Sequence, residues 1–208
     1  MQEEVIDMML RINPNLKPPQ NETELHFLLK NIAVSYLKSH FGCQFANKEI
    51  DIGAFYNKKF RHEFPDFPWG KRIADAVGIQ RKFDNKINDY ELIVRCIEVK
   101  ISKADLNNGY CTSGDYNYIM APKGLFTRDD LLPFVGLIEV DLENLRWDDG
   151  FAPIRGVEVT INSQKANYGR KNRDFWLEII KDKMLKAYTN EHAFKGLWFY
   201  PGFVYKKK

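Results

Sequence analysis

The chain has 208 residues, of which 44% are hydrophobic and 14% aromatic, so it can bury a sizeable core and is not expected to be disordered. Its formal net charge of +3 is too small for a general nucleic-acid coat, so a nucleic-acid surface would have to come from local clusters of lysine and arginine. We expect an unexported, cytoplasmic protein without a membrane partner, because no stretch approaches the roughly 18 apolar residues of a membrane span and the acidic N-terminus lacks a signal-peptide pattern.

The first predicted helix lies in NETELHFLLKNIAVSYLKSHFG, residues 21–42. Asn21 is suited to cap its start and Gly42 follows its end. Apolar residues recur through the segment at helical spacing, at Leu25, Leu28, Leu29, Ile32 and Tyr36. The prolines before this helix separate it from residues 1–20, which we interpret as an N-terminal extension.

Three extended segments follow, at residues 48–55, 71–80 and 90–101. The last two are joined by a short turn at 84–89 that is rich in Asp and Asn, which predicts a β-hairpin. Further along, we expect a short helix from Ser102, a buried strand at 115–122, a short helix at 127–134 capped by Thr127, and a strand at 136–142.

The remaining chain is predicted to form a hairpin and a helix. Its turn is DDG at 148–150 with VEVTI, residues 157–161, as the return strand, and a final helix runs from about 173 to 191. The order of elements indicates an α/β protein with a mixed sheet and helices packed on it. We assign residues 21–145 to the core and 146–208 to an elaboration of the same domain.

The strand CIEVKI places two opposite charges on one face. Because side chains alternate along a strand, Glu98 and Lys100 share one face, while Ile97, Val99 and Ile101 share the other. If the preceding hairpin centres in the turn at 85–88, Asp75 lies opposite Glu98. Their Cβ atoms would be only about 5 Å apart, so the two carboxylates would repel each other.

A divalent cation would offset that repulsion. Mg²⁺ accepts one or two carboxylates, keeps several waters and takes further ligands from substrate phosphates. Lys100 could then stabilise charge on a scissile phosphate or help to orient the attacking water, so the set predicts phosphodiester hydrolysis. The alternative is a simple ion pair of Lys100 with either acid, since an ExK triplet arises by chance about once in a chain of this length.

At these residues the chain resembles the PD-(D/E)XK nuclease superfamily and, within it, the MmcB-like DNA repair proteins. The resemblance rests on IADAV with Asp75, IEVKISKADL with Glu98 and Lys100, DYNYIMAPKGL, and VGLIEVD, and it runs from the first helix through Asp141. It implies a restriction-endonuclease-like αβββαβ core and a site for Mg²⁺, or alternatively Mn²⁺. The cation would be held by Asp75, Glu98 and the carbonyl of Val99, with Lys100 as the catalytic lysine.

Members of this superfamily often add an acid from the first helix, and Glu24 is the candidate here. The alternative is that Glu24 closes a capping box with Asn21, whose spacing it matches. Ser102 and Asp105 also stand in cap spacing, so we expect them to cap the helix that follows and, if they serve function, to position the turn after Lys100.

The best candidate nucleic-acid surface is FYNKKFRHEFPDFPWGKR, residues 55–72, which interleaves cations with aromatic rings. The alternative is that the rings pack against the sheet and leave only the cations outside. A second basic stretch at 164–173 could extend the surface. The predicted DNA-binding residues are Lys58, Lys59, Arg61, Trp69, Lys71 and Arg72.

Cysteine and histidine offer no competing site. Cys43, Cys96 and Cys111 form no CxxC pair, which argues against structural zinc and a disulfide scaffold. The four histidines form no HxxxH pair and lie beside no nucleophile motif.

The main hypothesis is therefore a Mg²⁺-dependent deoxyribonuclease in DNA repair or nucleic-acid processing. The first rival is a noncatalytic nucleic-acid-binding or partner-binding module on the same fold. A second rival is a sequence-specific restriction-type endonuclease, which would need a dimer and a recognition element. The oligomeric state stays open, with a homodimer among the options.

Overall fold

The computed structural model describes most of the chain between residues 20 and 166 and short parts of the C-terminal region. The predicted DNA-binding residues at 55–72 lie outside the described residues, as does most of the basic stretch at 164–173. The described residues are 20, 22–51, 73–86, 88–148, 152–166, 177, 179–181, 183–185, 198–200 and 203–205.

Helix α2, Glu24–Ser39, confirms the first predicted helix. The predicted cap at Asn21 is wrong, because Thr23 is the N-cap and its hydroxyl accepts a hydrogen bond from the backbone N–H of His26. The helix ends before Gly42, whose φ of 66° suits glycine in the turn that follows. Leu29, Ile32 and other apolar residues of its inner face are fully buried.

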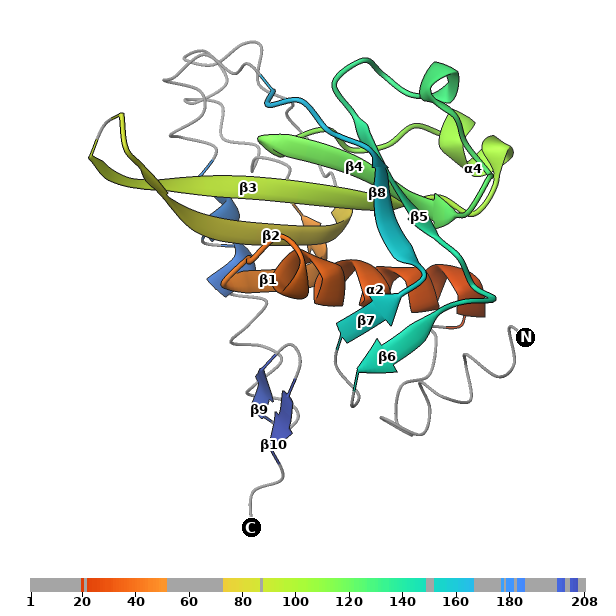
Figure 1. The fold of residues 1–208 in the computed structure, drawn as a ribbon, viewed down its shortest axis with the longest axis horizontal. Helices are drawn as coiled ribbons and strands as arrows, with labels where there is room; N and C mark the ends of the chain where they lie inside the picture. The colour runs from red at the N-terminus through yellow and green to blue at the C-terminus, as the bar shows by residue number, and fades with distance from the viewer. Residues whose placement is uncertain are drawn as a thin grey trace.

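The strands form one six-stranded mixed sheet in the order β1-β2-β3-β4-β5-β8 (Figure 1). The strands β3, β4 and β5 are parallel to one another, and the other neighbours are antiparallel. Their bounds are Phe45–Asp51 for β1, Ile73–Asp84 for β2, Asp89–Val99 for β3, Tyr116–Pro122 for β4, Gly136–Val140 for β5 and Val157–Ile161 for β8. The α/β class with a mixed sheet is confirmed.

The hairpin of β2 and β3 has the predicted register. Asp84 pairs with Asp89 at the turn, and Ala76 pairs with Ile97 at the far end. The next residues along the two strands are Asp75 and Glu98, as the sequence predicted. The short helix α4, Lys103–Asn107, follows β3 and is capped by Ser102, whose hydroxyl accepts a hydrogen bond from Asp105 N–H.

The predicted partner of VEVTI is wrong. β6, Arg146–Asp148, pairs with β7, Ala152–Arg155, whereas VEVTI is β8 and pairs with β5 at the edge of the main sheet. Gly156, with φ of 81°, separates β7 from β8 and lets the chain change direction. A further hairpin, β9 (Trp198–Tyr200) with β10 (Phe203–Tyr205), was not predicted.

The sheet is covered on both faces. Helix α2 packs on one face with Ile97 and Val99 of β3, and Figure 1 shows it lying along that side. On the other face Val94 and Cys96 cluster with Leu177, Ile180 and Met184, the described part of the predicted final helix. The three cysteines are buried and form no disulfide with one another. No helix in the described ranges is both long and apolar enough to cross a membrane. The 3-10 turn η1, Arg128–Asp130, replaces the longer helix expected at 127–134.

Candidate active site

Asp75 lies where the β2–β3 ladder ends, and its carboxylate faces α2. Its Oδ2 accepts a hydrogen bond of 2.8 Å from the backbone N–H of Val99. Its Oδ1 lies 3.3 Å from the ammonium nitrogen of Lys30 on the helix. The Asp75 side chain is 14% exposed, so it stands at the rim of the core.

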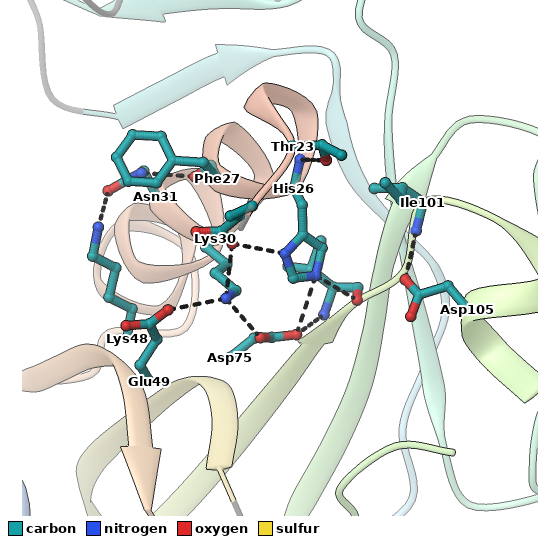
Figure 2. A network of polar contacts seen from close by, with 12 residues as sticks. Thr23, His26, Phe27, Lys30, Asn31, Lys48, Glu49, Asp75, Ile101 and Asp105 are labelled. Atoms are coloured by element: carbon teal, nitrogen blue, oxygen red, sulfur yellow. Dashed lines mark hydrogen bonds and ion pairs between the residues drawn. The ribbon is translucent and has the colours of Figure 1, made fainter. Parts of the chain in front are cut away.

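Lys30 connects three carboxylates (Figure 2). Its Nζ lies 2.8 Å from Glu22, 3.1 Å from Glu49 and 3.3 Å from Asp75. Burial alone would lower the pKa of Lys30, but these three carboxylates together raise it above its ordinary value. Glu49 reaches this position with φ of 54°, a backbone conformation that costs a residue other than glycine on the order of 1 kcal/mol.

His26 fills the space between this cluster and the end of β3. Its Nδ1 lies 2.7 Å from Glu22 Oε1, and its Nε2 lies 3.3 Å from the Val99 carbonyl and 3.8 Å from Asp75 Oδ2. Burial tends to raise the pKa of Glu22, but hydrogen bonds from Lys30 and His26 lower it, so this carboxylate accepts and Nδ1 donates. Glu22 therefore fixes the ring with Nε2 toward the strand ends, as Figure 2 shows.

Glu98 is buried, with 6% of its surface exposed, and its Oε1 has no hydrogen-bond partner among the residues that the structure describes. Burial and then the negative charge of Asp75 raise its pKa from 4.5 to about 8. Lys100 and the backbone amides of Asp75 and Cys111 act in the opposite direction. Glu98 thus has the environment of a carboxylate that lacks a full counter-charge.

Lys100 is also buried and follows the last residue of β3. Its backbone N–H donates to the Met120 carbonyl, and its ammonium lies 3.3 Å from Asp105 Oδ1. The other oxygen of Asp105 accepts a hydrogen bond from Ile101 N–H. The expectation that Ser102 caps α4 is confirmed, and Asp105 both braces the turn after Lys100 and pairs with its ammonium.

The acid that reaches the cluster from the helix end is Glu22, whereas Glu24 is the exposed first residue of α2. Sequence reasoning missed Glu22, His26, Lys30 and Glu49. A partial signal was present, because His26 and Lys30 are spaced by four residues and share one face of α2, and Glu22 stands four residues before His26, just ahead of the Thr23 cap.

The donor set suits a hard divalent cation with few protein ligands. Within the described ranges no group of three or more His, Cys, Asp or Glu side chains is arranged to hold a metal. Mg²⁺, however, needs only one or two carboxylates, and the unpartnered buried oxygen of Glu98 fits such an ion. An open pocket of about 510 Å³ adjoins the cluster and is lined by Glu22, Thr23, His26, Lys30, Glu49, Ile101, Ser102 and Asp105.

We expect Lys30→Met to destabilise the protein by about 2–3 kcal/mol, because it leaves Glu22 and Asp75 without their counter-charge. Urea unfolding in EDTA measures this loss. Mg²⁺ should then raise the melting temperature more in this variant than in the unmodified protein.

The matched control is Lys123→Met, which breaks the exposed Lys123–Asp141 pair and should leave the free energy of unfolding nearly unchanged. Equal stability of the Lys30 and Lys123 variants would contradict the central role of Lys30.

Comparison with protein-family models and with curated proteins gave no match. Among solved structures, the chain is similar to SPO1766, a protein of unknown function from Silicibacter pomeroyi. The two share 15% identity over 88% of this chain and 94% of that chain, with a TM-score of 0.46.

Proposed function

We propose that the protein is a metal-dependent nuclease that hydrolyses DNA phosphodiester bonds, with a restriction-endonuclease-like core of the PD-(D/E)XK kind. The observation that carries the proposal is Glu98, a buried carboxylate with an unpartnered oxygen beside Asp75 and Lys100. The order α2, β1, β2, β3, α4, β4 supports it, since it matches the αβββαβ pattern that the resemblance implies.

In this proposal Asp75, Glu98 and the Val99 carbonyl hold Mg²⁺ or Mn²⁺. The bound cation would activate water and neutralise charge on the phosphate. The protein's own groups act around it: Val99 N–H fixes the Asp75 carboxylate, and Asp105 holds the Lys100 ammonium, whose charge lowers the pKa of Glu98 against the effect of burial. Lys100 is thereby available to stabilise negative charge that develops on the phosphate. A role in DNA repair or nucleic-acid processing rests on the MmcB-like resemblance alone.

One observation favours the rival, a noncatalytic nucleic-acid-binding or partner-binding module. Lys30 already places a positive charge 3.3 Å from Asp75, and this neutralises the carboxylate as a metal ion would. A protein that needed no cation could keep the carboxylates with this lysine alone.

Cleavage assays decide between the two. Purified protein is incubated with single-stranded, duplex and flapped DNA, and with RNA of the same sequence, in Mg²⁺, Mn²⁺ or EDTA. We expect cutting of DNA that requires the divalent cation and is lost in Asp75→Asn. Salt-dependent DNA binding without cutting, unchanged by EDTA, would replace the nuclease with the binding module.

A further inference from the structure

The hairpin of β2 and β3 extends beyond the sheet as a two-stranded arm. β1 pairs with β2 only as far as Ile79, and β4 pairs with β3 only from Arg95. Residues 80–93 therefore have no neighbouring strand on either side within the described sheet, and Figure 1 shows the hairpin projecting from it. We call the described residues of this segment the arm.

One face of the arm carries two exposed aromatic rings. Phe83 pairs with Tyr90 across the strands, and their ring centroids are 5.2 Å apart at 75°. The rings keep 43% and 51% of their surface exposed. On the same face Arg81 holds its guanidinium 3.9 Å from the centroid of the Tyr90 ring. A cross-strand aromatic pair stabilises a hairpin, but that role does not require both rings to be exposed.

The charges of the arm are divided between its two faces. Arg81 and Leu92 pair with each other on the aromatic face, and Arg81 is the one charged residue of that face within the described arm strands. The acids Asp84, Asp89 and Glu91 alternate onto the opposite face, where Glu91 lies across from Lys82 and also pairs with Lys165. The aromatic face is therefore positive, which suits a polyanion whose bases are free to stack.

The arm lies at a defined distance from the candidate site. By alternation, Tyr90 and Glu98 project from the same face of β3, eight residues apart, which is about 26 Å along the strand. Val94 and Cys96 between them are buried in a cluster with Leu177, Ile180 and Met184, so the two ends would be separate contacts. With a rise of about 3.4 Å per nucleotide, they are about eight nucleotides apart along stacked DNA.

We propose that the arm binds unpaired DNA bases by stacking them on Phe83 and Tyr90 while Arg81 holds an adjoining phosphate, about eight nucleotides from the site of cleavage. The cleavage distance and the choice of DNA over RNA rest on the proposed function, whereas the stacking of single-stranded bases on the arm does not. Stacking on an exposed aromatic ring tolerates any base, so the partner is single-stranded DNA without sequence preference.

The test is binding in EDTA, where cleavage cannot contribute. Single-stranded oligonucleotides that carry 2-aminopurine report stacking by fluorescence quenching and affinity by anisotropy. We expect Phe83→Ala and Tyr90→Ala each to weaken binding roughly 5- to 100-fold and to reduce the quenching. Phe83→Tyr and Tyr90→Phe should retain both signals, and circular dichroism confirms that the arm variants fold.

Arg81 and Lys82 provide a matched pair of controls, because they are adjacent, equal in charge and on opposite faces. Arg81→Ala should weaken binding several-fold, and Lys82→Ala should change it by less than about twofold. Equal effects of the two changes, or alanine variants that bind and quench as the unmodified protein does, would overturn the proposal. The proposal would also be overturned if the alanine variants lost a dimer in sedimentation while their DNA binding stayed unchanged, because the arm would then be a contact between copies of the chain.

The proposal for the arm and the proposal of nuclease activity can be rejected independently. Ring-dependent quenching without any cutting would reject the nuclease and keep the stacking contact. Cutting that is insensitive to every arm substitution would keep the nuclease and reject the arm. If both hold, shortening the DNA to fewer than about eight nucleotides on the arm side of the cut should reproduce the affinity of the alanine variants.

Discussion

Replacing Lys100 with methionine is expected to lower the rate of DNA cleavage by roughly 10²- to 10³-fold, the loss typical when one preorganised electrostatic group is removed from an active site. Methionine keeps the length and the apolar stem of lysine but removes the charge. Lys100 is 7% exposed, so its ammonium acts where solvent screens it little. Single-turnover kinetics in Mg²⁺ measure the effect on the chemical step.

Lys103→Met is the control, because it removes the same charge three residues away. The Lys103 side chain is 66% exposed and pairs with Asp130 at the surface, so its loss should leave the rate within about twofold. DNA binding should be nearly equal in the two variants. If Lys100→Met cuts as fast as Lys103→Met, Lys100 has no part in the reaction and its pairing with Asp105 is structural.

The register of the β2–β3 hairpin could be predicted from the sequence because a short polar turn between two regular strands determines it locally. Once the turn at 85–88 is centred, every pair follows as far as Ala76 with Ile97, which leaves Asp75 and Glu98 as the next residues of the two strands. The caps of the short elements were also readable, since Ser102 and Thr127 each precede an acid by three residues.

The cluster around Lys30 could not be predicted with the same rules. The cluster depends on which side of α2 faces the end of β3. That orientation is determined by how the helix packs on the sheet and cannot be read from the helix sequence alone. Asn21 and Thr23 are both good caps, and the choice between them decides which glutamate faces the strand ends. The partner of β8 was missed for a related reason, because pairing with β5 is not local in the chain whereas a hairpin is.

The charges around Asp75 explain how one fold could serve either proposed function. Lys30 and His26 approach Asp75 from α2, while Glu98 and Lys100 belong to the end of β3. The charge of Asp75 is already balanced by Lys30 from the helix. The charge of Glu98 is only partly balanced by Lys100, and a bound cation would supply the missing positive charge.

The stability of the protein in EDTA is expected to fall as the pH rises from about 4.5 to about 8, because of Glu98. Burial and Asp75 raise its folded-state pKa to about 8 from an ordinary 4.5, so between these values the folded state binds a proton that the unfolded state has lost. The free energy of unfolding therefore decreases as the pH rises. The decrease is complete only above about pH 8, where Glu98 is ionised in the folded state as well. The difference across the window is on the order of 3–5 kcal/mol.

Glu98→Gln should flatten this dependence, because glutamine keeps the shape of the protonated acid and cannot ionise. Urea unfolding at pH 5 should find the two proteins nearly equal, and at pH 8 the variant should be the more stable. Glu143→Gln at an exposed position should leave the slope unchanged. A slope that survives in Glu98→Gln would assign the titration to another group. Mg²⁺ should stabilise the unmodified protein more at pH 8 than at pH 5, since the cation binds the ionised pair, and it should do so only weakly in the variant.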